Sequence, residues 1–328
     1  MSMNYAVIDL GSNTIRLSVY GCEGGQCYKI FSQKEVAGLA GYVSNGFLEM
    51  AGIQKACAIL NSFHKIASKL APPENIHLFA TASLRNIENR GQAVRMIAGE
   101  TSLIPDVLTG DEEAAFGFAG VSQVIRGDSG LMIDIGGAST ELVVFKDRQP
   151  VHRTSIPFGC LNLYMNCVHD IMPTNSERKQ IKQIIKEQFS RIDWNIDGRL
   201  TCMVGIGGTM RAALKLSRAL FNVPYDQNEI HAGCVKEISE MLENNLNDIH
   251  HTVYKTIPDR LHTIAPGLSI LKRAIKTFGC EIITVSEFGI REGYLAGRVL
   301  KQNDVNPLLQ KIPSPAGQAQ RKKQQTAG

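Results

Sequence analysis

Residues 131–145 read LMIDIGGASTELVVF, and residues 6–20 read AVIDLGSNTIRLSVY. Both stretches place an apolar run, an aspartate, a glycine-containing turn with hydroxyl side chains, and a second apolar run in the same order. Two apolar strands joined by a short glycine turn predict a β-hairpin in each copy. One aligned pair differs in charge, because Arg16 stands opposite Glu141. The identical pairs are Ile8/Ile133, Asp9/Asp134, Gly11/Gly136, Leu17/Leu142 and Val19/Val144.

The length of the chain, 328 residues, predicts two domains, because a single hydrophobic core stops growing at roughly 250–300 residues. The second hairpin begins near residue 128, so we expect one domain over 1–126 and a similar one over 127–303. The 44% hydrophobic and 20% charged contents are ordinary for a soluble protein. No apolar run approaches the roughly 18 residues of a membrane span, and no signal-peptide pattern opens the chain. We therefore expect a cytoplasmic protein without a membrane partner.

Short apolar segments rich in Ile, Val and Leu alternate with longer amphipathic ones, which predicts an α/β fold with largely buried sheets. The helix around 288–301 lies at the end of the second domain and can pack back on the first. Strands are expected at 4–10, 14–21, 76–81, 103–108, 130–135, 140–146, 201–206 and 281–286. Helices are expected at 51–70, 89–99, 111–125, 176–194, 208–221, 234–245, 259–278 and 288–301.

Charge and cysteine content exclude several classes of protein. The net charge is +4, and three basic residues of a Pro/Gly/Gln-rich tail supply most of it. We expect that tail, residues 304–328, to be disordered. The remaining body is nearly neutral, which argues against a nucleic-acid partner. The eight cysteines contain no Cys-x-x-Cys pair. Buried reduced thiols are therefore expected, rather than a disulfide framework or a zinc site.

The doubled turn has a chemical use. Glycines let the backbone approach a ligand closely, and successive N–H groups form a nest for anions. Ser12, Asn13, Ser139 and Thr140 add side-chain donors. Such a turn beside an aspartate suits a phosphate chain carried with a divalent cation. One glycine hairpin turn is common and weak evidence, but two copies in register favour a functional interpretation.

Three further segments place polar side chains at strand or helix ends. In FATASLRN, Thr81 and Arg85 follow a strand, where α/β folds bind ligands. In VLTGDEEAAFGFAGV, Asp111 is the expected N-cap of a helix, followed by Glu112 and Glu113. Acids favour a helix's first turn for dipole reasons, yet one of them can also reach the cleft and accept a proton.

The third segment, MVGIGGTMRAALKL, places Gly207, Gly208 and Thr209 at a helix N-terminus. Free N–H groups at such a terminus bind phosphate. A Gly-Gly pair before a helix is equally common as a simple packing turn, so both interpretations stay open.

Taken together, these segments resemble the exopolyphosphatase/guanosine pentaphosphate phosphatase (Ppx/GppA) family. The matching pieces are VIDLGSNTIRL, ATASLRN, TGDEEAAFGFAGV, MIDIGGASTEL, GIGGT and SEFGIREGYLAG, in that order from residue 6 to residue 297. The resemblance implies two actin-like (ribonuclease H-like) domains with the active site in the cleft between them. It further implies a short family member without a C-terminal HD-type domain, and possible homodimers.

The resemblance also implies roles for individual residues. Glu113 resembles the family's catalytic base, with Glu112 as the neighbouring alternative. Mg²⁺ or another divalent cation would be held, directly or through water, by Asp134 and Glu141, with Asp9 as a lesser candidate. Phosphates would be held from both domains by Ser12, Asn13, Arg16, Thr81, Arg85, Gly136, Gly137, Ser139 and Thr140.

The activity expected from the resemblance is metal-dependent release of terminal orthophosphate from inorganic polyphosphate. One alternative is hydrolysis of guanosine pentaphosphate (pppGpp), and another is a catalytically weak sensor of polyphosphate or alarmone. Two departures from the family pattern motivate the sensor. Ala138 stands where relatives carry a third glycine, at a cost of about 1 kcal/mol if the turn needs a positive φ. Residues 35–46 lack the family's Arg-Leu-Gly segment.

Overall fold

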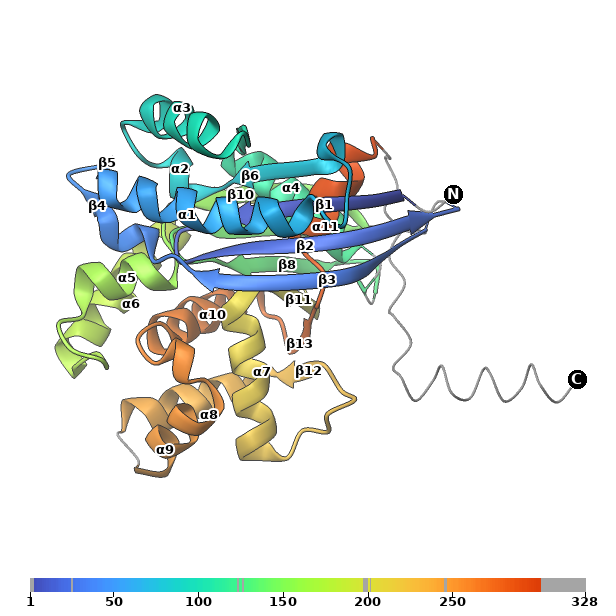
Figure 1. The fold of residues 1–328 in the computed structure, drawn as a ribbon. Coiled ribbons are helices and arrows are strands. Elements are labelled where there is room, and N and C mark those ends of the chain that lie inside the picture. Colours follow the sequence, from blue (N-terminus) through green and yellow to red (C-terminus); the bar gives the residue numbers. More distant parts are fainter. Residues whose placement is uncertain are drawn as a thin grey trace, which may run out of the picture.

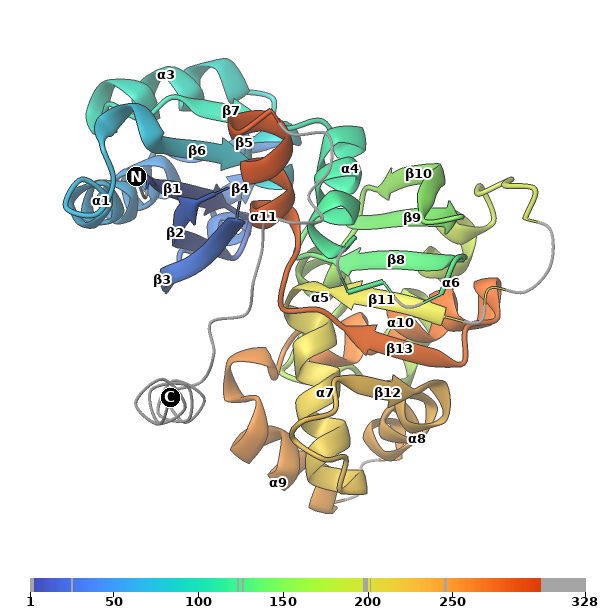
Figure 2. The same cartoon turned by 90° about the vertical axis from the view of Figure 1, so that its right-hand side faces the viewer.

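The chain folds into two lobes, each built on a twisted mixed β-sheet with helices packed against it (Figure 1 and Figure 2). This computed structural model describes residues 3–24, 26–122, 124–125, 127–196, 200, 202–244 and 247–301. The expected tail at 304–328 lies outside the described residues. No helix in the described ranges has both the length and the apolar character needed to cross a bilayer.

The first sheet has the strand order β3-β2-β1-β6-β7, and the second has the order β10-β9-β8-β11-β13-β12. The first lobe contains β1 (Met3–Leu10), β2 (Thr14–Glu23), β3 (Gln26–Val36), β4 (Val43–Ser44), β5 (Phe47–Leu48), β6 (Ile76–Ala80) and β7 (Pro105–Val107). The second contains β8 (Gly130–Ile135), β9 (Thr140–Lys146), β10 (Gln149–Ile156), β11 (Cys202–Ile206), β12 (Glu229–His231) and β13 (Ile282–Val285).

The two sheets share a five-strand topology, to which the second sheet adds β12, antiparallel to β13. In the shared part, three antiparallel strands are followed by two parallel strands added on the far side of the first strand. The registers also agree, because Asp9 pairs with Arg16 and Asp134 pairs with Glu141. The duplication that the two hairpin sequences predicted is thus a duplication of whole sheets, and the expected α/β class is confirmed.

Helices cover the sheets through apolar stripes. In the first helix, for example, Ile53, Leu60 and Phe63 are all buried in the core of the first lobe. The α-helices are α1 (Met50–Ala67), α2 (Ala82–Arg85), α3 (Arg90–Thr101), α4 (Gly110–Val121), α5 (Cys160–Cys167), α6 (Asn175–Phe189), α7 (Gly207–Phe221), α8 (Ala232–Glu243), α9 (Asn247–Thr256), α10 (Ile264–Phe278) and α11 (Ile290–Tyr294). Short turns are η1 (Leu39–Tyr42), η2 (Pro73–Asn75), η3 (Pro258–Arg260) and the π-turn η4 (Leu295–Val299).

The sequence prediction missed the third strand of each antiparallel unit, β3 and β10, together with β4, β5, β12, α2, α5 and α9. The two third strands are edge strands, and most of their residues are exposed or half-buried. β3 reads QCYKIFSQKEV, with polar residues on most positions. An edge strand buries little apolar surface, so it lacks the Ile/Val/Leu run by which the central strands were recognised.

At the domain junction, two helices each pack against the sheet of the lobe opposite to the strand that they follow. Ala114, Phe118 and Val121 of α4 pack against the second sheet, although α4 follows the last strand of the first. Ile290 and Tyr294 of α11 pack against the first sheet, as the sequence analysis expected. A division of the chain at residue 126 therefore places α4 with the wrong sheet. The two helices also contact each other, and Figure 2 shows them together between the lobes.

The contact between these helices requires glycine. A Cβ added at Gly293 would lie 1.8 Å from the Phe116 carbonyl oxygen, and one at Gly120 would lie 1.9 Å from the Gly289 carbonyl oxygen. Both clashes are with backbone, which cannot rotate away. Gly293→Ala is therefore expected to lower the free energy of unfolding by about 1–3 kcal/mol.

Denaturant unfolding of Gly293→Ala and Gly99→Ala measures this effect. Gly99 lies in α3, and a Cβ there would meet nothing within 4 Å. The control substitution should stabilise the protein by about 0.5–1 kcal/mol, because alanine is the better helix former. Equal stability of the two variants would contradict the close helix contact.

The prediction of reduced thiols is wrong for two cysteines. Cys22 and Cys27 occupy opposed positions on β2 and β3 and form a disulfide. The prediction failed because β3 was not recognised. Without β3, nothing in the sequence indicated that the two cysteines lie opposite each other on neighbouring strands. The other six cysteines are free.

Candidate active site

The two glycine turns face each other across the domain junction. A Cβ added at Gly137 would lie 3.7 Å from the Ser12 Cβ atom. The turns are closed by equivalent hydrogen bonds, in which Gly11 N–H donates to the Thr14 carbonyl at 3.1 Å and Gly136 N–H donates to the Ser139 carbonyl at 3.0 Å. The hairpin duplication therefore builds two matching loops that point into one space.

Neighbouring backbone takes up the carbonyl groups of both turns. The N–H groups of Ala37 and Gly38 donate to the Asn13 carbonyl, each at 2.9 Å. In the second turn, Leu161 N–H donates to the Gly137 carbonyl at 2.9 Å. Within the part of the chain that the structure describes, the amides of Ser12, Asn13, Gly137 and Ala138 make no hydrogen bond. Unpaired amides beside outward-held carbonyls are the donor pattern of an anion nest.

Ala138 does not strain the second turn. Its φ is not positive, and neither Gly136 nor Gly137 has a φ in the left-handed region. The conformational cost that a missing third glycine would impose therefore does not arise. The other departure from the family pattern is the segment at 35–46. Its residues Ala37 and Gly38 donate the backbone hydrogen bonds that hold the first turn.

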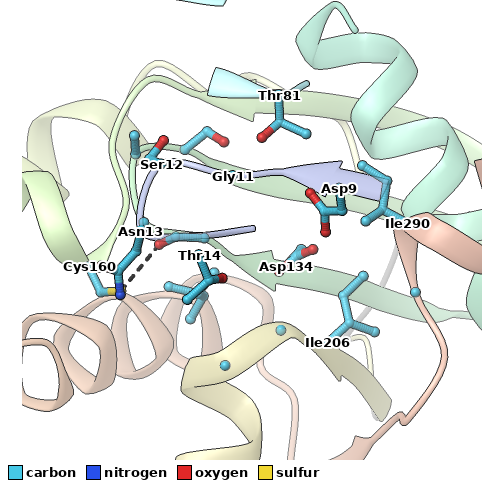
Figure 3. Close-up of a pocket in the computed structure, with 18 of the residues that line it drawn as sticks. Asp9, Gly11, Ser12, Asn13, Thr14, Thr81, Asp134, Cys160, Ile206 and Ile290 are labelled. Atoms are coloured by element: carbon cyan, nitrogen blue, oxygen red, sulfur yellow. Dashed lines mark hydrogen bonds between the residues drawn. The ribbon is translucent and has the colours of Figure 1, made fainter. Parts of the chain in front are cut away.

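A pocket of about 150 Å³ lies between the lobes and is lined by both turns. Figure 3 shows Asp9 from β1 and Asp134 from β8 directed into this hollow, with Ser12 and Thr81 around it. The predicted site residues that line the pocket are Asp9, Ser12, Asn13, Arg16, Thr81, Glu113, Asp134, Gly136, Gly137, Ser139, Gly207 and Gly208.

Glu113 is a buried carboxyl group at the wall of this pocket. Arg85 Nη1 lies 2.6 Å from Glu113 Oε2 and also donates to the Leu108 carbonyl at 3.1 Å. Burial raises the pKa of Glu113 to about 7, against the lowering effect of Arg85, while Asp134 and Asp9 raise it further. A carboxyl group with a pKa near neutrality is suited to general base catalysis. Arg85 does not line the pocket, and the structure pairs it with Glu113.

Glu112 has a structural place in the same helix. The N-cap of α4 is Thr109, not Asp111, and Glu112 completes a capping box with it. Glu112 also accepts a hydrogen bond from Arg298 at 2.7 Å. Both bonds lower the pKa of Glu112, and its side chain does not line the pocket. The structure thus separates the two adjacent acids, which the sequence could not do.

Three other expected site residues do not line the pocket. The Thr140 hydroxyl donates to the Phe158 carbonyl at 2.8 Å, and the Thr209 hydroxyl donates to the Ile135 carbonyl at 3.4 Å. Both threonines are buried and hold backbone in position. Glu141 is paired with Asp134 across the β8–β9 ladder, and its Oε1 accepts a hydrogen bond from Ser155 at 2.7 Å.

Three arginines to which the sequence analysis assigned no role complete the pocket with Arg16: Arg211, Arg260 and Arg291. The glycines of the GIGGT segment make room for Arg260 and for Asp134. A Cβ at Gly208 would lie 2.0 Å from Arg260 Nη2, and one at Gly207 would lie 2.4 Å from Asp134 Oδ1. Gly207 also has a φ of +88°. A glycine pair at a helix start followed by an arginine one turn later was a signal that could have identified Arg211.

The acids of the site suit a divalent cation. Burial raises the pKa values of Asp9 and Asp134, that of Asp134 to about 6, and raises the pKa of Glu141 well above its ordinary value. Glu141 Oε2 is shielded from solvent and has no hydrogen-bond partner among the described residues. Within the described residues no three His, Cys, Asp or Glu side chains form a complete metal site. Mg²⁺ prefers one or two carboxylates plus water and phosphate oxygens, so these oxygen donors fit it.

These raised pKa values predict a pH-dependent stability. A carboxyl group with a raised pKa in the folded state contributes stability below its unfolded pKa and loses it as pH rises through the folded value. For Asp134, stability should therefore be lost between pH 3.8, the ordinary pKa of the group, and about pH 6, its raised pKa in the folded protein. Relative to Asp134→Asn, the wild type should therefore lose stability over this range. Because protons and cation compete for the carboxylates, Mg²⁺ should raise Tm by roughly 3 °C more at pH 8 than at pH 5.5.

Calorimetric scans with Mg²⁺ or with a chelator, at both pH values, measure this difference. Asp134→Asn is the matched variant and should show a smaller Mg²⁺ shift at pH 8. A Tm shift that is the same at both pH values would contradict a cation bound by these acids.

Comparisons with known proteins agree with this geometry. Residues 18–302 match the model of the Ppx/GppA phosphatase family. A Vibrio cholerae protein named guanosine-5'-triphosphate,3'-diphosphate pyrophosphatase is 28% identical over 316 residues, which cover 92% of this chain and 61% of the relative. A Fusobacterium nucleatum bifunctional 3-dehydroquinate synthase/phosphatase is 28% identical over 298 residues, covering 86% of this chain and 44% of that protein. The chain thus spans less than two thirds of the length of these relatives.

Solved structures show the same fold. The Aquifex aeolicus member of the Ppx/GppA family has a TM-score of 0.74 at 24% identity, covering 92% of this chain and 99% of that one. An exopolyphosphatase from Cytophaga hutchinsonii has a TM-score of 0.80 at 19% identity, with the same coverage of both chains. The match along the sequence, the actin-like architecture and the paired turns around one pocket agree: the chain belongs to the Ppx/GppA phosphatase family.

Proposed function

We propose that this protein hydrolyses a terminal phosphoanhydride bond and releases orthophosphate from inorganic polyphosphate. One observation carries the proposal: a single pocket joins two amide nests, four arginines and a buried carboxyl group, Glu113, whose pKa is about 7. Phosphoryl transfer to water needs anion binding, compensation of charge and a base for the nucleophile. All three are supplied by groups at the wall of this pocket.

Glu113 would orient a water molecule and accept its proton as the water attacks the terminal phosphorus. Its ion pair with Arg85 holds the carboxylate in one orientation. Because the pKa is about 7, a large fraction of Glu113 is ionised at neutral pH, yet the group remains basic enough to accept a proton. The shortened polyphosphate chain then leaves with the electrons of the broken P–O bond.

The negative charge of the phosphates would be balanced from both lobes. Arg16 comes from β2 and Arg211 from α7, and both line the pocket with the unpaired amides of the two turns. Preorganised donors of this kind stabilise charge that develops in the transition state. Asp9, Asp134 and Glu141 would hold Mg²⁺, which supplies further positive charge to the phosphate oxygens.

A second candidate substrate is guanosine pentaphosphate. It is favoured by the name of the Vibrio cholerae relative, which is 28% identical over 92% of this chain. Both substrates present a terminal phosphate on a phosphoanhydride, so the same base, arginines and amides would serve either one.

Release of orthophosphate from long polyphosphate, tripolyphosphate and guanosine pentaphosphate, with Mg²⁺ or with a chelator, tests the proposal. We expect Mg²⁺-dependent release from at least one linear polyphosphate. Saturable binding of polyphosphate without any release would overturn the hydrolase proposal and support the sensor alternative. Release from the nucleotide alone would replace the first substrate by the second.

A further inference from the structure

Glu292 is a buried carboxylate that does not line the pocket. It lies on α11, the helix that follows β13 of the second sheet and packs against the first (Figure 2). Burial raises the pKa of Glu292, but Arg291 and Lys29 lower it more, to about 2, so the group is charged at neutral pH. Burying a charge costs free energy, and apolar packing would anchor a helix at least as well. A charge at this place therefore indicates a need for a fixed orientation instead of a need for stability.

Three donors hold the Glu292 carboxylate in one position. The Tyr20 hydroxyl donates to Oε1 at 2.7 Å, and Lys29 Nζ lies 2.9 Å from the same oxygen. Oε2 accepts a hydrogen bond from Gly289 N–H at 2.9 Å, at the start of the helix. Tyr20 and Lys29 are opposed on β2 and β3. Glu292, Tyr20 and Lys29, here called the Glu292 cluster, therefore join the first turn of a five-residue helix to two strands of the first lobe.

A β-bulge brings Lys29 to α11. Tyr20 is paired with Lys29 and Val19 with Phe31, so Ile30 is an additional residue in β3. In a regular strand Lys29 and Phe31 would point to the same face of the sheet. Phe31 instead packs against the core that contains α1, whereas Lys29 contacts α11, which packs on the other face. Bulges re-aim side chains in this way and are common beside active sites.

The residue next to Glu292 reaches the pocket from the same helix. Arg291 lines the pocket, and its Nη1 donates to Asp9 Oδ2 at 3.1 Å. Its Nε is shielded from solvent and has no hydrogen-bond partner among the described residues. Successive residues of a helix point about 100° apart. Holding Glu292 against the strands therefore fixes the direction in which the Arg291 side chain leaves the helix.

From these contacts we propose that the Glu292 cluster is a positioning group, which holds Arg291 where its guanidinium binds a phosphate oxygen of the substrate. The inference rests on the proposed function, because it assumes that the pocket takes a polyphosphate. The members of the cluster do not line the pocket, so they act on the substrate only through Arg291. An arginine that binds phosphate equally in the bound substrate and in the transition state contributes to KM and much less to kcat.

Steady-state kinetics with tripolyphosphate and saturating Mg²⁺ test the cluster, or with guanosine pentaphosphate if only that compound is hydrolysed. Lys29→Met keeps the apolar stem of a side chain that is 29% exposed and removes its charge. Tyr20→Phe removes only the hydroxyl that donates to Glu292. Each variant should raise KM about tenfold and leave kcat within about twofold of the wild type. Lys29→Arg keeps the charge and should keep the wild-type KM.

Tyr294→Phe is the matched control. Tyr294 lies on the same helix, and its hydroxyl donates to Asp106 at 3.1 Å, so this variant also loses a hydrogen bond to a carboxylate. It should lower Tm about as much as Tyr20→Phe does and leave KM unchanged. An equal rise of KM in Tyr294→Phe would show that the helix only needs support, and would overturn the inference. So would a wild-type KM in Lys29→Met, or a rise in Lys29→Arg as large as that in Lys29→Met.

Binding measurements separate this inference from the proposed function. If the wild type releases no orthophosphate, the hydrolase proposal fails, and calorimetric titration with tripolyphosphate and Mg²⁺ tests the cluster alone. Kd should then rise about tenfold in Lys29→Met and keep the wild-type value in Tyr294→Phe. Equal Kd values for the wild type and Lys29→Met would overturn the inference, as would a wild type that does not bind tripolyphosphate.

Discussion

Replacing Glu113 by glutamine is expected to lower kcat for orthophosphate release by about 10²- to 10⁴-fold, the usual contribution of a positioned general base. Glutamine keeps the shape and the hydrogen-bonding capacity of the side chain but cannot accept a proton from water. Because Glu113 does not need to contact the distal phosphates, KM should change much less than kcat. Initial rates with Mg²⁺ over a range of polyphosphate concentrations separate the two constants.

Glu112→Gln is the matched control, since the two acids are adjacent in sequence. Glu112 caps α4 and pairs with Arg298, so its neutral variant should cost about 1 kcal/mol of stability and leave kcat near the wild-type value. If Glu113→Gln retained wild-type turnover, or if Glu112→Gln lost it, the assignment of the base would have to be abandoned.

Replacing Arg85 by methionine is the second change with a large expected effect. The guanidinium lies 2.6 Å from the Glu113 carboxylate and favours its ionised form. Removing that charge raises the pKa of Glu113 above about 7, by about one to three units for an opposite charge at this distance. Since the base must be ionised to act, the rising limb of the kcat/KM profile should move to higher pH by the same amount.

The loss of activity should therefore be about tenfold or more at pH 7 and should shrink as the pH rises. Arg298→Met is the control, because Arg298 pairs with the neighbouring Glu112 and should leave the limb in place. A pH-independent loss in Arg85→Met would show that Arg85 acts on substrate or on folding instead of on the ionisation of Glu113.

The fold could be predicted from local patterns because its central strands are buried. Ala6, Val7 and Ile8 of β1 and Leu131, Met132 and Ile133 of β8 are fully shielded from solvent. Strands covered on both faces are continuous apolar runs, and such runs can be read directly from a sequence. The edge strands β3 and β10 are not covered in this way and therefore lack continuous apolar runs. Because β3 was not predicted, the Cys22–Cys27 disulfide was not predicted either.

Site residues could be predicted where a short sequence segment determines its own backbone conformation, as a glycine turn does. The turns at Gly11 and Gly136, with Asp9 and Asp134 beside them, line the pocket as their sequences indicated. Arg291 also reaches it, yet it comes from a helix whose pattern predicts only packing. Which face of a helix meets a cleft depends on the other lobe, and no local signal encodes that.

The sequence by itself determined the duplicated hairpin, the α/β class and the location of the glycine turns, because strand burial and turn chemistry are properties of consecutive residues. Only the tertiary structure separated Glu112, which caps α4, from Glu113 at the pocket wall, and paired Arg85 with Glu113. The physical reason is that the ionisation and partners of a side chain depend on burial and on charges from distant segments. Those neighbours exist only once the two lobes have packed together.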